Sequence, residues 1–230
     1  MTKCGKKIKK ASEAVEKNQM YTAEKALQKV KEVAYASFDE SIDVDVNLGI
    51  DPTKGEQAVR GSVVLPHGSG KRVKVIVFAR GDHAQLAEKA GADVVGAQDL
   101  ADKIKDGWLD FDFAVATPDM MGAVGKLAKI LGPRGLLPNQ KLGTVTFEVA
   151  QVVKELKSGK SFFKNDKGGL VHFSIGKKSF DEKKLQDNLQ AFVKALSSVK
   201  PSSSKGKFIR KVTISSTMGI GLQVNAEGIV

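Results

Sequence analysis

The sequence predicts a fold of mixed class, with α/β architecture in the middle of the chain and α+β architecture at its two ends. Between residues 67 and 158, short apolar runs alternate with helical patterns, which is typical of a parallel, doubly wound sheet. The flanking segments alternate apolar and polar residues, which is typical of an antiparallel sheet with one solvent-facing side. Neither flank has enough strands for a stable sheet of its own, so we expect both to build one domain.

The middle segment presents its elements in a regular order. The expected strands are "KRVKVIVFAR", "ADVVG" and "DFAVATP". The expected helices that follow them are "DHAQLAEKAG", "AQDLADKIKDG" and "DMMGAVGKLAKIL". A "TVTFE" strand and a helix over residues 149–157 would complete a doubly wound α/β domain of three layers.

The flanks predict an antiparallel sheet covered by a helix. "SIDVDVNLGI" places one apolar face on a strand, made of Ile42, Val44, Val46 and Leu48, and "AVRGSVVL" is expected to pair with it. After residue 160 the expected strands are "SFFK", "LVHFSIG", "KFIRKVTIS" and "GLQVN". Between them lies a helix whose apolar face consists of Leu185, Leu189, Phe192, Val193 and Leu196.

The two domains are expected to be joined by two crossings. We place the outer domain at residues 1–66 and 159–230 and the inserted domain at residues 67–158. The crossings, "LPHGSGK" at 65–71 and "KSGK" at 157–160, are rich in small, turn-prone residues. They predict a two-strand hinge between the domains, with hinge residues Pro66, His67, Gly68 and Gly159.

The charge of the chain indicates an acidic partner. A formal charge of +11 and a pI near 9.6 favour binding to nucleic acid or to an anionic membrane surface. Residues 1–66 carry 11 basic and 10 acidic side chains, residues 67–153 carry 11 and 10, and residues 154–230 carry 15 and 6. The outer domain therefore holds most of the excess positive charge, although a lysine cluster is often only a solvated surface.

Cysteine content and hydropathy favour a soluble, cytoplasmic protein without a membrane span. Cys4 is the single cysteine, so an internal disulfide or a cysteine metal cluster is not expected. The N-terminal stretch lacks the apolar core of a signal peptide, and no segment approaches the roughly 20 apolar residues that a membrane-spanning helix needs.

The sequence does not show a catalytic set. The first predicted α/β turn has one glycine where a dinucleotide fold needs G-x-G-x-x-G, and "GSGKR" has Arg72 where a phosphate loop needs Ser or Thr. The three histidines, His67, His83 and His172, lie in different segments without metal-ligand spacing. We therefore expect no metal, no cofactor and no enzymatic activity. A nucleotide-binding enzyme is the alternative, and a nucleotide that co-purifies would favour it.

The stretch "LGPRGLLPN" at residues 131–139 raises the question of a phosphate-binding loop. Pro133 and Pro138 lack amide donors, and no strand-to-helix turn with Lys and Ser or Thr surrounds Arg134. We interpret the stretch as a helix stop and a rigid elbow. Arg134 remains a candidate contact to a binding partner or to the domain interface.

Several of these motifs together resemble a known family. The sequence is similar to the bacterial form of the first-numbered protein of the large ribosomal subunit, the L-one family of the mobile side stalk. The resemblance rests on "GIDP", "VRG", "LPHGSGK", "GWLDFDFAVATPDMMG", "LGPRGLLPN", "KNDKGGLVHFSIGK" and "TMG", in that order. It covers about residues 3–230.

The resemblance implies a structural, RNA-binding ribosomal protein that is a monomer when free. The outer domain would bind the rRNA stalk of the large subunit, and the inserted domain would reach towards tRNA that leaves the exit site. The resemblance also implies repression of translation, through binding to the mRNA of the protein's own operon. The implied location is the cytoplasm, on the ribosome.

The resemblance also implies an RNA-binding face. Its residues in this chain are Phe38, Glu40, Ser41, Lys164, Asp166, Lys167, Ser216, Thr217, Met218 and Gly219. In this interpretation Thr217 bonds a 2′-hydroxyl, Met218 packs on a ribose or a base, and Gly219 lets the RNA approach closely. The alternative from the residues alone is that "TMG" is only a tight turn between strands.

The segment at residues 37–41 would form the second half of that face. Phe38 offers a flat apolar surface, while Glu40 and Ser41 offer acceptors for ribose hydroxyls or brace the turn. The alternative for Phe38 is a core side chain. Ser37 stands where the family commonly has lysine, which places a phosphate contact there in doubt, although Lys164 or Lys167 could replace it.

Overall fold

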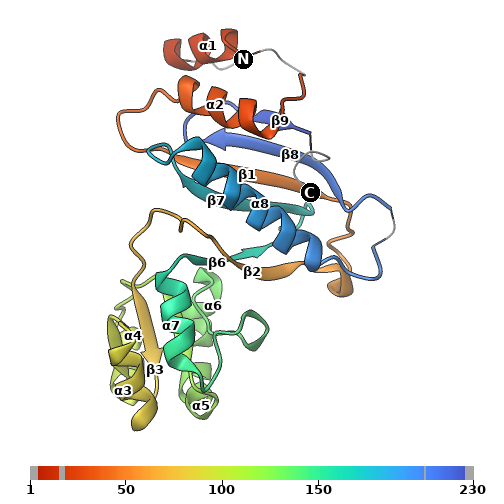
Figure 1. The fold of residues 1–230 in the computed structure, drawn as a ribbon. Coiled ribbons are helices and arrows are strands. Elements are labelled where there is room, and N and C mark those ends of the chain that lie inside the picture. The colour runs from red at the N-terminus through yellow and green to blue at the C-terminus, as the bar shows by residue number, and fades with distance from the viewer. Residues whose placement is uncertain (1–4, 16–18, 205, 226–230) are drawn as a thin grey trace. The chain divides into compact units, whose positions relative to one another are not determined.

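The chain divides into two compact units in the computed structural model, which describes residues 5–15, 19–204 and 206–225 (Figure 1). Unit 1 consists of residues 1–70 and 161–230, and unit 2 of residues 71–160. The predicted mixture of helices and strands in several sheets is confirmed. The domain limits and the hinge stay predictions. In the described part of the chain, every helix is too short or too polar to cross a membrane.

Unit 1 combines four helical segments with six strands. They are α1 (Lys6–Glu13), α2 (Ala23–Val33), β1 (Ser41–Leu48), η1 (Gly55–Gln57), β2 (Arg60–Val64), β6 (Lys160–Lys164), β7 (Leu170–Lys177), α8 (Glu182–Ser198), β8 (Ile209–Ser216) and β9 (Leu222–Val224). Strands β7, β1, β8 and β9 form one antiparallel sheet in that order, and β2 pairs with β6. The first residue of β6, Lys160, belongs to unit 2.

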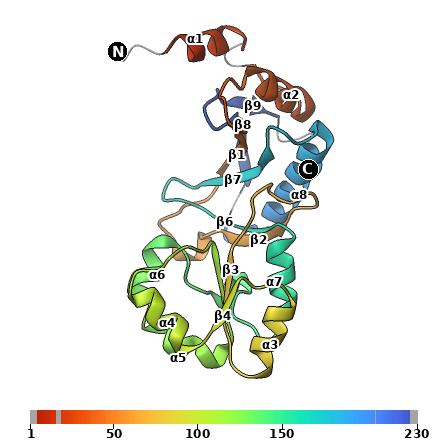
Figure 2. The same cartoon turned by 90° about the vertical axis from the view of Figure 1, so that its left-hand side faces the viewer.

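The core of unit 1 lies between the four-stranded sheet and the helices α2 and α8 (Figures 1 and 2). The predicted apolar face of β1 is confirmed, because Ile42, Val44, Val46 and Leu48 are all buried. The apolar face of α8 is likewise buried, and its Phe192 stacks on Phe173 of β7 with ring centroids 4.3 Å apart. Apolar residues recur at every second position in the strands and about every 3.6 positions in the helix. The apolar faces that result therefore meet in one core layer.

Two details of the predicted sheet are wrong. The "AVRGSVVL" strand does not pair with β1, because β7 and β8 occupy both edges of β1 and leave β2 to pair with β6. The helix α2 was absent from the prediction. Its buried residues are Ala26, Leu27 and Val30, an apolar stripe that six polar or charged side chains obscure in the sequence.

Unit 2 is built around a parallel three-stranded sheet in the order β4, β3, β5. Its strands are β3 (Val75–Phe78), β4 (Val94–Gly96) and β5 (Phe113–Ala116). Its helical segments are α3 (Asp82–Lys89), α4 (Gln98–Lys105), η2 (Pro118–Met120), α5 (Met121–Gly125), α6 (Ala128–Arg134), η3 (Gln140–Leu142) and α7 (Val149–Lys157). Every residue of the central strand β3 is buried, as a strand covered on both faces requires.

Helices cover both faces of this sheet, with α3 and α7 on one side and α4, α5 and α6 on the other (Figure 2). The predicted "TVTFE" strand is wrong, because Val145 makes only a single bridge to Ala116. The predicted helix "DMMGAVGKLAKIL" is broken into η2, α5 and α6. Pro118 starts the first piece, and Gly122 and Gly125 lower the helix propensity of the second.

The stretch "LGPRGLLPN" ends a helix, as predicted. Gly135 has φ 72° just after α6, its N–H donates to the Gly132 carbonyl, and the Leu136 N–H donates to the Leu131 carbonyl. These two bonds form a Schellman motif, which only a residue tolerant of positive φ closes at no cost. Arg134 is exposed as the last residue of α6.

A buried asparagine fastens the start of the first crossing to α8. The Asn188 side chain is 0% exposed and donates to the Gly68 carbonyl at 3.0 Å and to the Ile175 carbonyl at 2.8 Å. It also accepts from the His67 N–H at 3.2 Å. His67 and Gly68, two of the predicted hinge residues, are therefore held to unit 1 by side-chain hydrogen bonds.

Candidate RNA-binding surface

The segments at residues 37–41 and 216–219, which the sequence predicts to share a site, lie side by side at one end of the large sheet. The Thr217 N–H donates to the Ser41 carbonyl at 3.0 Å, and the Ser41 N–H donates to the Thr217 hydroxyl oxygen at 2.9 Å. The Thr217 hydroxyl donates in turn to the Ser41 carbonyl at 3.3 Å. We call these two segments together the strand-end junction.

Glu40 braces this junction from inside. Its side chain is 0% exposed, and one carboxylate oxygen accepts from the Ala36 N–H at 2.8 Å while the other accepts from the Met218 N–H at 3.1 Å. The Glu40 carbonyl accepts from the Lys178 N–H at 2.8 Å. Of the two roles that the sequence allowed, the structure supports bracing the turn, because its burial keeps the carboxylate from contact with a ribose.

The charge on Glu40 is stabilised by its surroundings. Burial opposes ionisation, but the Ser216 hydroxyl, the Ala36 and Met218 amides and the Lys178 ammonium together hold the pKa of Glu40 below its ordinary value of 4.5. The Ser216 hydroxyl is buried and makes no well-formed hydrogen bond to any described residue. The Ser216 hydroxyl is close enough to the Glu40 carboxylate to favour its charged form, but their geometry is not that of a hydrogen bond. The groups that hydrogen-bond to the carboxylate are therefore the Ala36 and Met218 amides.

Two large apolar side chains project from the junction into solvent. The side chain of Phe38 is 53% exposed and that of Met218 is 50% exposed, although Glu40 and Ser216, each two residues away, are buried. The alternative interpretation of Phe38 as a core side chain is therefore wrong. An exposed aromatic ring and an exposed thioether, carried by two segments that Glu40 holds together, are surfaces on which a base or a ribose can stack.

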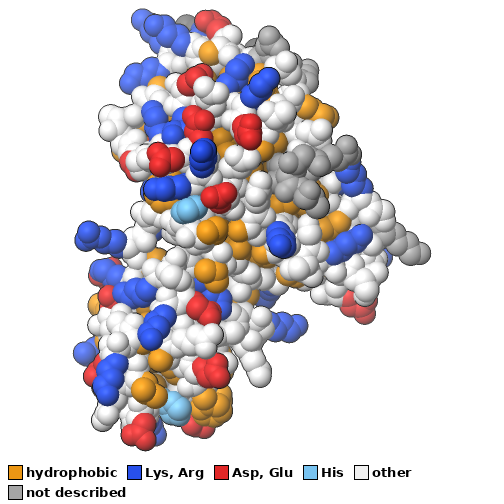
Figure 3. Space-filling model, viewed as in Figure 1, with side chains coloured by type: hydrophobic (Ala, Val, Ile, Leu, Met, Phe, Trp, Pro, Cys, Tyr) orange, Lys and Arg blue, Asp and Glu red, His pale blue; other side chains and the backbone are white. Residues whose placement is uncertain are grey.

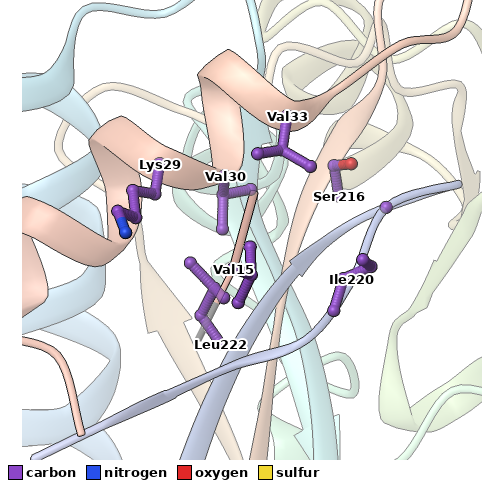
Figure 4. A pocket seen from close by; sticks show the side chains of 8 residues that line it. Val15, Lys29, Val30, Val33, Ser216, Ile220 and Leu222 are labelled. Atoms are coloured by element: carbon purple, nitrogen blue, oxygen red, sulfur yellow. The ribbon is translucent and has the colours of Figure 1, made fainter. Parts of the chain in front are cut away.

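The turn at residues 216–219 rests on an apolar support. Val15, Val30, Val33, Ile220 and Leu222 surround a small hollow beneath it that leaves no room for a water molecule (Figure 4). A Cβ atom on Gly219 would come within 2.3 Å of the Ser216 hydroxyl oxygen. Close packing from below and the tight approach of Gly219 fix the position of the turn.

Polar rows run from this junction along the face of the sheet opposite the apolar core. The register gives the row Ser41 and Lys177 first, followed by Asp43, Ser174 and Ser215, then Asp45, His172 and Thr213, and last Asn47, Leu170 and Lys211. The Lys177 ammonium donates to the Ser41 hydroxyl at 2.9 Å, and a His172 ring nitrogen lies 2.6 Å from the Asp45 carboxylate. This face is rich in hydroxyls, carboxylates and a few cations.

The predicted residues Lys164, Asp166 and Lys167 do not join the strand-end junction. Lys164 is the last residue of β6, and Asp166 and Lys167 lie in the turn between β6 and β7. The junction lies beside the last residue of β7, and the eight residues of that strand separate its two ends by about 23 Å. The Asp166 carboxylate accepts from the Gly168 and Leu170 amides, which lowers its pKa and stiffens its own turn. The ten predicted residues therefore form two separate clusters on unit 1.

Positive charge is concentrated on unit 1, as the sequence suggested. With the observed limits, unit 1 carries 23 basic and 15 acidic side chains and unit 2 carries 14 and 11. On the helical face of unit 1, basic and acidic side chains alternate rather than forming one continuous patch (Figure 3). The four exposed or partly exposed lysines of α1 make the densest basic cluster in one helix.

The three histidines of the chain lie in different surroundings. Among the described residues, no three His, Cys, Asp or Glu side chains come together to hold a metal ion. His67 pairs with Asp187 at 2.9 Å and His172 pairs with Asp45, whereas His83 lies against Phe147 with ring centroids 5.8 Å apart. Cys4 lies outside the described residues.

The features of the strand-end junction favour one class of protein. A braced loop junction with an exposed aromatic ring, hydroxyls and neighbouring lysines is typical of an RNA-binding protein rather than an enzyme. A scan against protein-family models agrees, because residues 30–220 match the Ribosomal protein L1p/L10e family. The chain belongs to this family. The family consists of structural, non-enzymatic proteins of the large ribosomal subunit, so the chain is a ribosome-associated protein of translation.

Proposed function

We propose that unit 1 binds the rRNA of the mobile side stalk of the large subunit through the strand-end junction. One observation carries the proposal: the buried Glu40 carboxylate ties the Phe38 loop to the Met218 turn, so that two exposed side chains are presented together. Family membership supports rRNA as the partner. The excess positive charge of unit 1 supports the attraction of an RNA backbone.

The hydroxyls of the junction are suited to ribose. The Thr217 oxygen already donates to the Ser41 carbonyl and accepts from the Ser41 N–H, which leaves one lone pair for a 2′-hydroxyl. The Ser41 hydroxyl accepts from Lys177 and keeps its proton for an outside acceptor. Fixed hydroxyls beside an apolar platform would recognise a folded RNA by shape, without a code read in the major groove.

The open sheet face offers a route from the junction to a second contact. Asp166 lies 3.9 Å from the His172 ring and so shares that face, with Lys164 and Lys167 close by in the chain. A stalk RNA that lies along the polar rows would meet the junction at one end and these two lysines at the other. In this proposal the two clusters bind separate parts of the RNA.

Three finer functions belong to the same proposal. Unit 2 would contact tRNA at the exit site and assist its release, with Arg134 as a contact because it is exposed at the end of α6. An mRNA of the protein's own operon that imitates the stalk would occupy the same junction and repress translation. Family membership supports a role in translation.

Thr217→Val tests the junction directly. We expect affinity for a stalk rRNA fragment to fall by about 1–3 kcal/mol, because a ribose hydroxyl and the Ser41 backbone both lose a hydrogen-bond partner. The measurement is a binding titration with the stalk fragment and with a random RNA duplex of equal length. Thr22→Val is the matched control, because the Thr22 hydroxyl makes no capping hydrogen bond. Equal loss for both RNAs would contradict the proposal.

Salt dependence should separate anchoring lysines from the junction. We expect the logarithm of affinity to fall linearly with the logarithm of salt concentration, by about 0.7–0.9 per phosphate neutralised. Replacing Lys9 of α1 with glutamine should weaken binding of the stalk RNA and of the random RNA alike, since its side chain is exposed. The slope should fall by the amount that corresponds to about one phosphate contact. A loss confined to the stalk RNA would instead make Lys9 part of the specific site.

A further inference from the structure

The helix α4 ends in a turn that holds the only tryptophan of the chain, Trp108, in a fixed position. The Trp108 N–H donates to the Lys103 carbonyl and the Gly107 N–H donates to the Ile104 carbonyl, both at 3.1 Å. Gly107 has φ 102°, the conformation that closes this double-bonded helix end. Trp108 is therefore fixed to the last turn of α4 by backbone hydrogen bonds.

A pocket of about 510 Å³ opens beside this tryptophan. It is lined by Trp108, Val94, Lys103 and Asp106, and Lys103 and Asp106 share one face of α4 because they are three residues apart. Trp108 packs against the core of unit 2 and lies 5.7 Å from the Phe111 ring. The indole is thus supported from behind while part of it lines a space large enough for a nucleoside.

The charges around the pocket decide which part of a nucleotide fits. The carbonyl end of α4 carries partial negative charge and Asp106 adds a full one, so a phosphate would be repelled. A flat ring stacks favourably on an indole. The Asp106 carboxylate accepts two N–H donors, and the Lys103 ammonium donates to an oxygen.

We propose that this pocket binds an unpaired guanine of an RNA chain. Guanine alone among the four bases presents two adjacent donors, N1–H and the N2 amino group, beside the O6 acceptor on one edge. Asp106 would accept from the two donors, Lys103 would donate to O6, and Trp108 with Val94 would enclose the ring. The sugar and phosphates would stay in solvent. This site belongs to unit 2 and does not depend on the strand-end junction of unit 1.

The intrinsic fluorescence of the full-length protein tests the proposal, because Trp108 is its only tryptophan. We expect a nine-nucleotide oligouridine with one central guanosine to quench the emission. The dissociation constant should be at least roughly tenfold lower than for the same oligonucleotide with a central adenosine, cytidine or uridine. Asp106→Asn should abolish the preference for guanosine, because an amide cannot accept from both donors, and Lys103→Gln should weaken binding of the guanosine oligonucleotide.

Asp102→Asn is the control variant, because Asp102 pairs with Lys105 at 2.7 Å and does not line the pocket. It should quench like the wild type, and so should Thr217→Val, whose altered site is in unit 1. Quenching of equal strength by all four oligonucleotides, or a guanosine preference that survives in Asp106→Asn, would overturn the guanine site. An absence of quenching would overturn it too. None of these outcomes would affect stalk binding by unit 1, which the titration with Thr217→Val measures separately.

Discussion

Glu40→Ala is expected to lower the free energy of unfolding of unit 1 by about 2–5 kcal/mol, since two amides would lose their only acceptor inside a closed space. Affinity for stalk rRNA should fall on the order of tenfold or more, because Phe38 and Met218 would no longer share a brace. Hydrogen exchange of peptides that contain residues 36–41 and 216–219 measures the first effect. Asp39→Asn is the control, since the exposed Asp39 bonds only Ser179 and is expected to change little.

The pH dependence of this effect has a definite sign. The folded pKa of Glu40 lies below its ordinary value, so the unfolded chain binds the proton at higher pH than the folded one. The stabilisation from the carboxylate is complete above the unfolded pKa and is lost as pH falls through the lower folded pKa. The difference in unfolding free energy between wild type and Glu40→Gln should therefore be constant above about pH 5.5 and shrink below about pH 4.5. A difference that persists unchanged to about pH 3 would contradict the assignment.

Asn188→Ala is expected to lower the free energy of unfolding of unit 1 by about 2–4 kcal/mol. It would leave the Ile175 and Gly68 carbonyls and the His67 N–H without their partner, and the side chain of Asn188 is 0% exposed. Peptides from residues 65–70 should exchange their amide hydrogens faster, because this segment would be released from α8.

The neighbouring residue provides the control for Asn188. Asp187→Asn removes only an exposed pair with His67 and should cost less than about 1 kcal/mol. Exchange of the peptides in unit 2 should stay unchanged in both variants. Equal protection of residues 65–70 in wild type and Asn188→Ala would show that other contacts hold the crossing.

Much of the fold could be predicted from periodicity alone. The strand at residues 41–48 alternates apolar and acidic side chains, and the helix α7 begins and ends at the residues that its apolar pattern indicates. Such patterns are local, and a buried face leaves little choice between helix and strand. The central strand β3 is apolar on both faces, and this pattern predicted a parallel sheet for the same reason.

The predictions that were wrong depend on contacts between residues that are far apart in the sequence. Whether β2 pairs with β1 or with β6 depends on which strands return from more than 90 residues away, and the sequence of β2 fits either partner. The helix α2 was missed because only three of its eleven residues are buried. The "TVTFE" segment has the composition of a strand but finds only one bridge, at Val145.

The sequence predicted that the segments at 37–41 and 216–219 lie together, but it did not show where residues 164–167 lie. Thr217 and Ser41 meet as expected, because β1 begins where the antiparallel β8 ends, and Phe38 and Met218 lie close to them in the chain. Lys164 and Lys167 precede β7 and therefore lie at the opposite end of the sheet from the junction. This follows from the direction of β7, which spacing in the sequence does not show. Asn188 gave no signal, because a buried amide looks like any polar residue of a helix until its neighbours are known.

The order of strands in unit 1 has a consequence for how the protein emerges during its own synthesis. Strand β1 lies between β7 and β8, yet β7 begins roughly 120 residues after β1 ends. At about 5–20 residues per second, the nascent chain would carry β1 with two unpaired edges for several seconds or more. Unit 2 is complete within that interval, since its residues are continuous. Nascent chains of this protein should therefore fold from the inside of the sequence outwards, and a chaperone that shields β1 in the meantime would have a defined target.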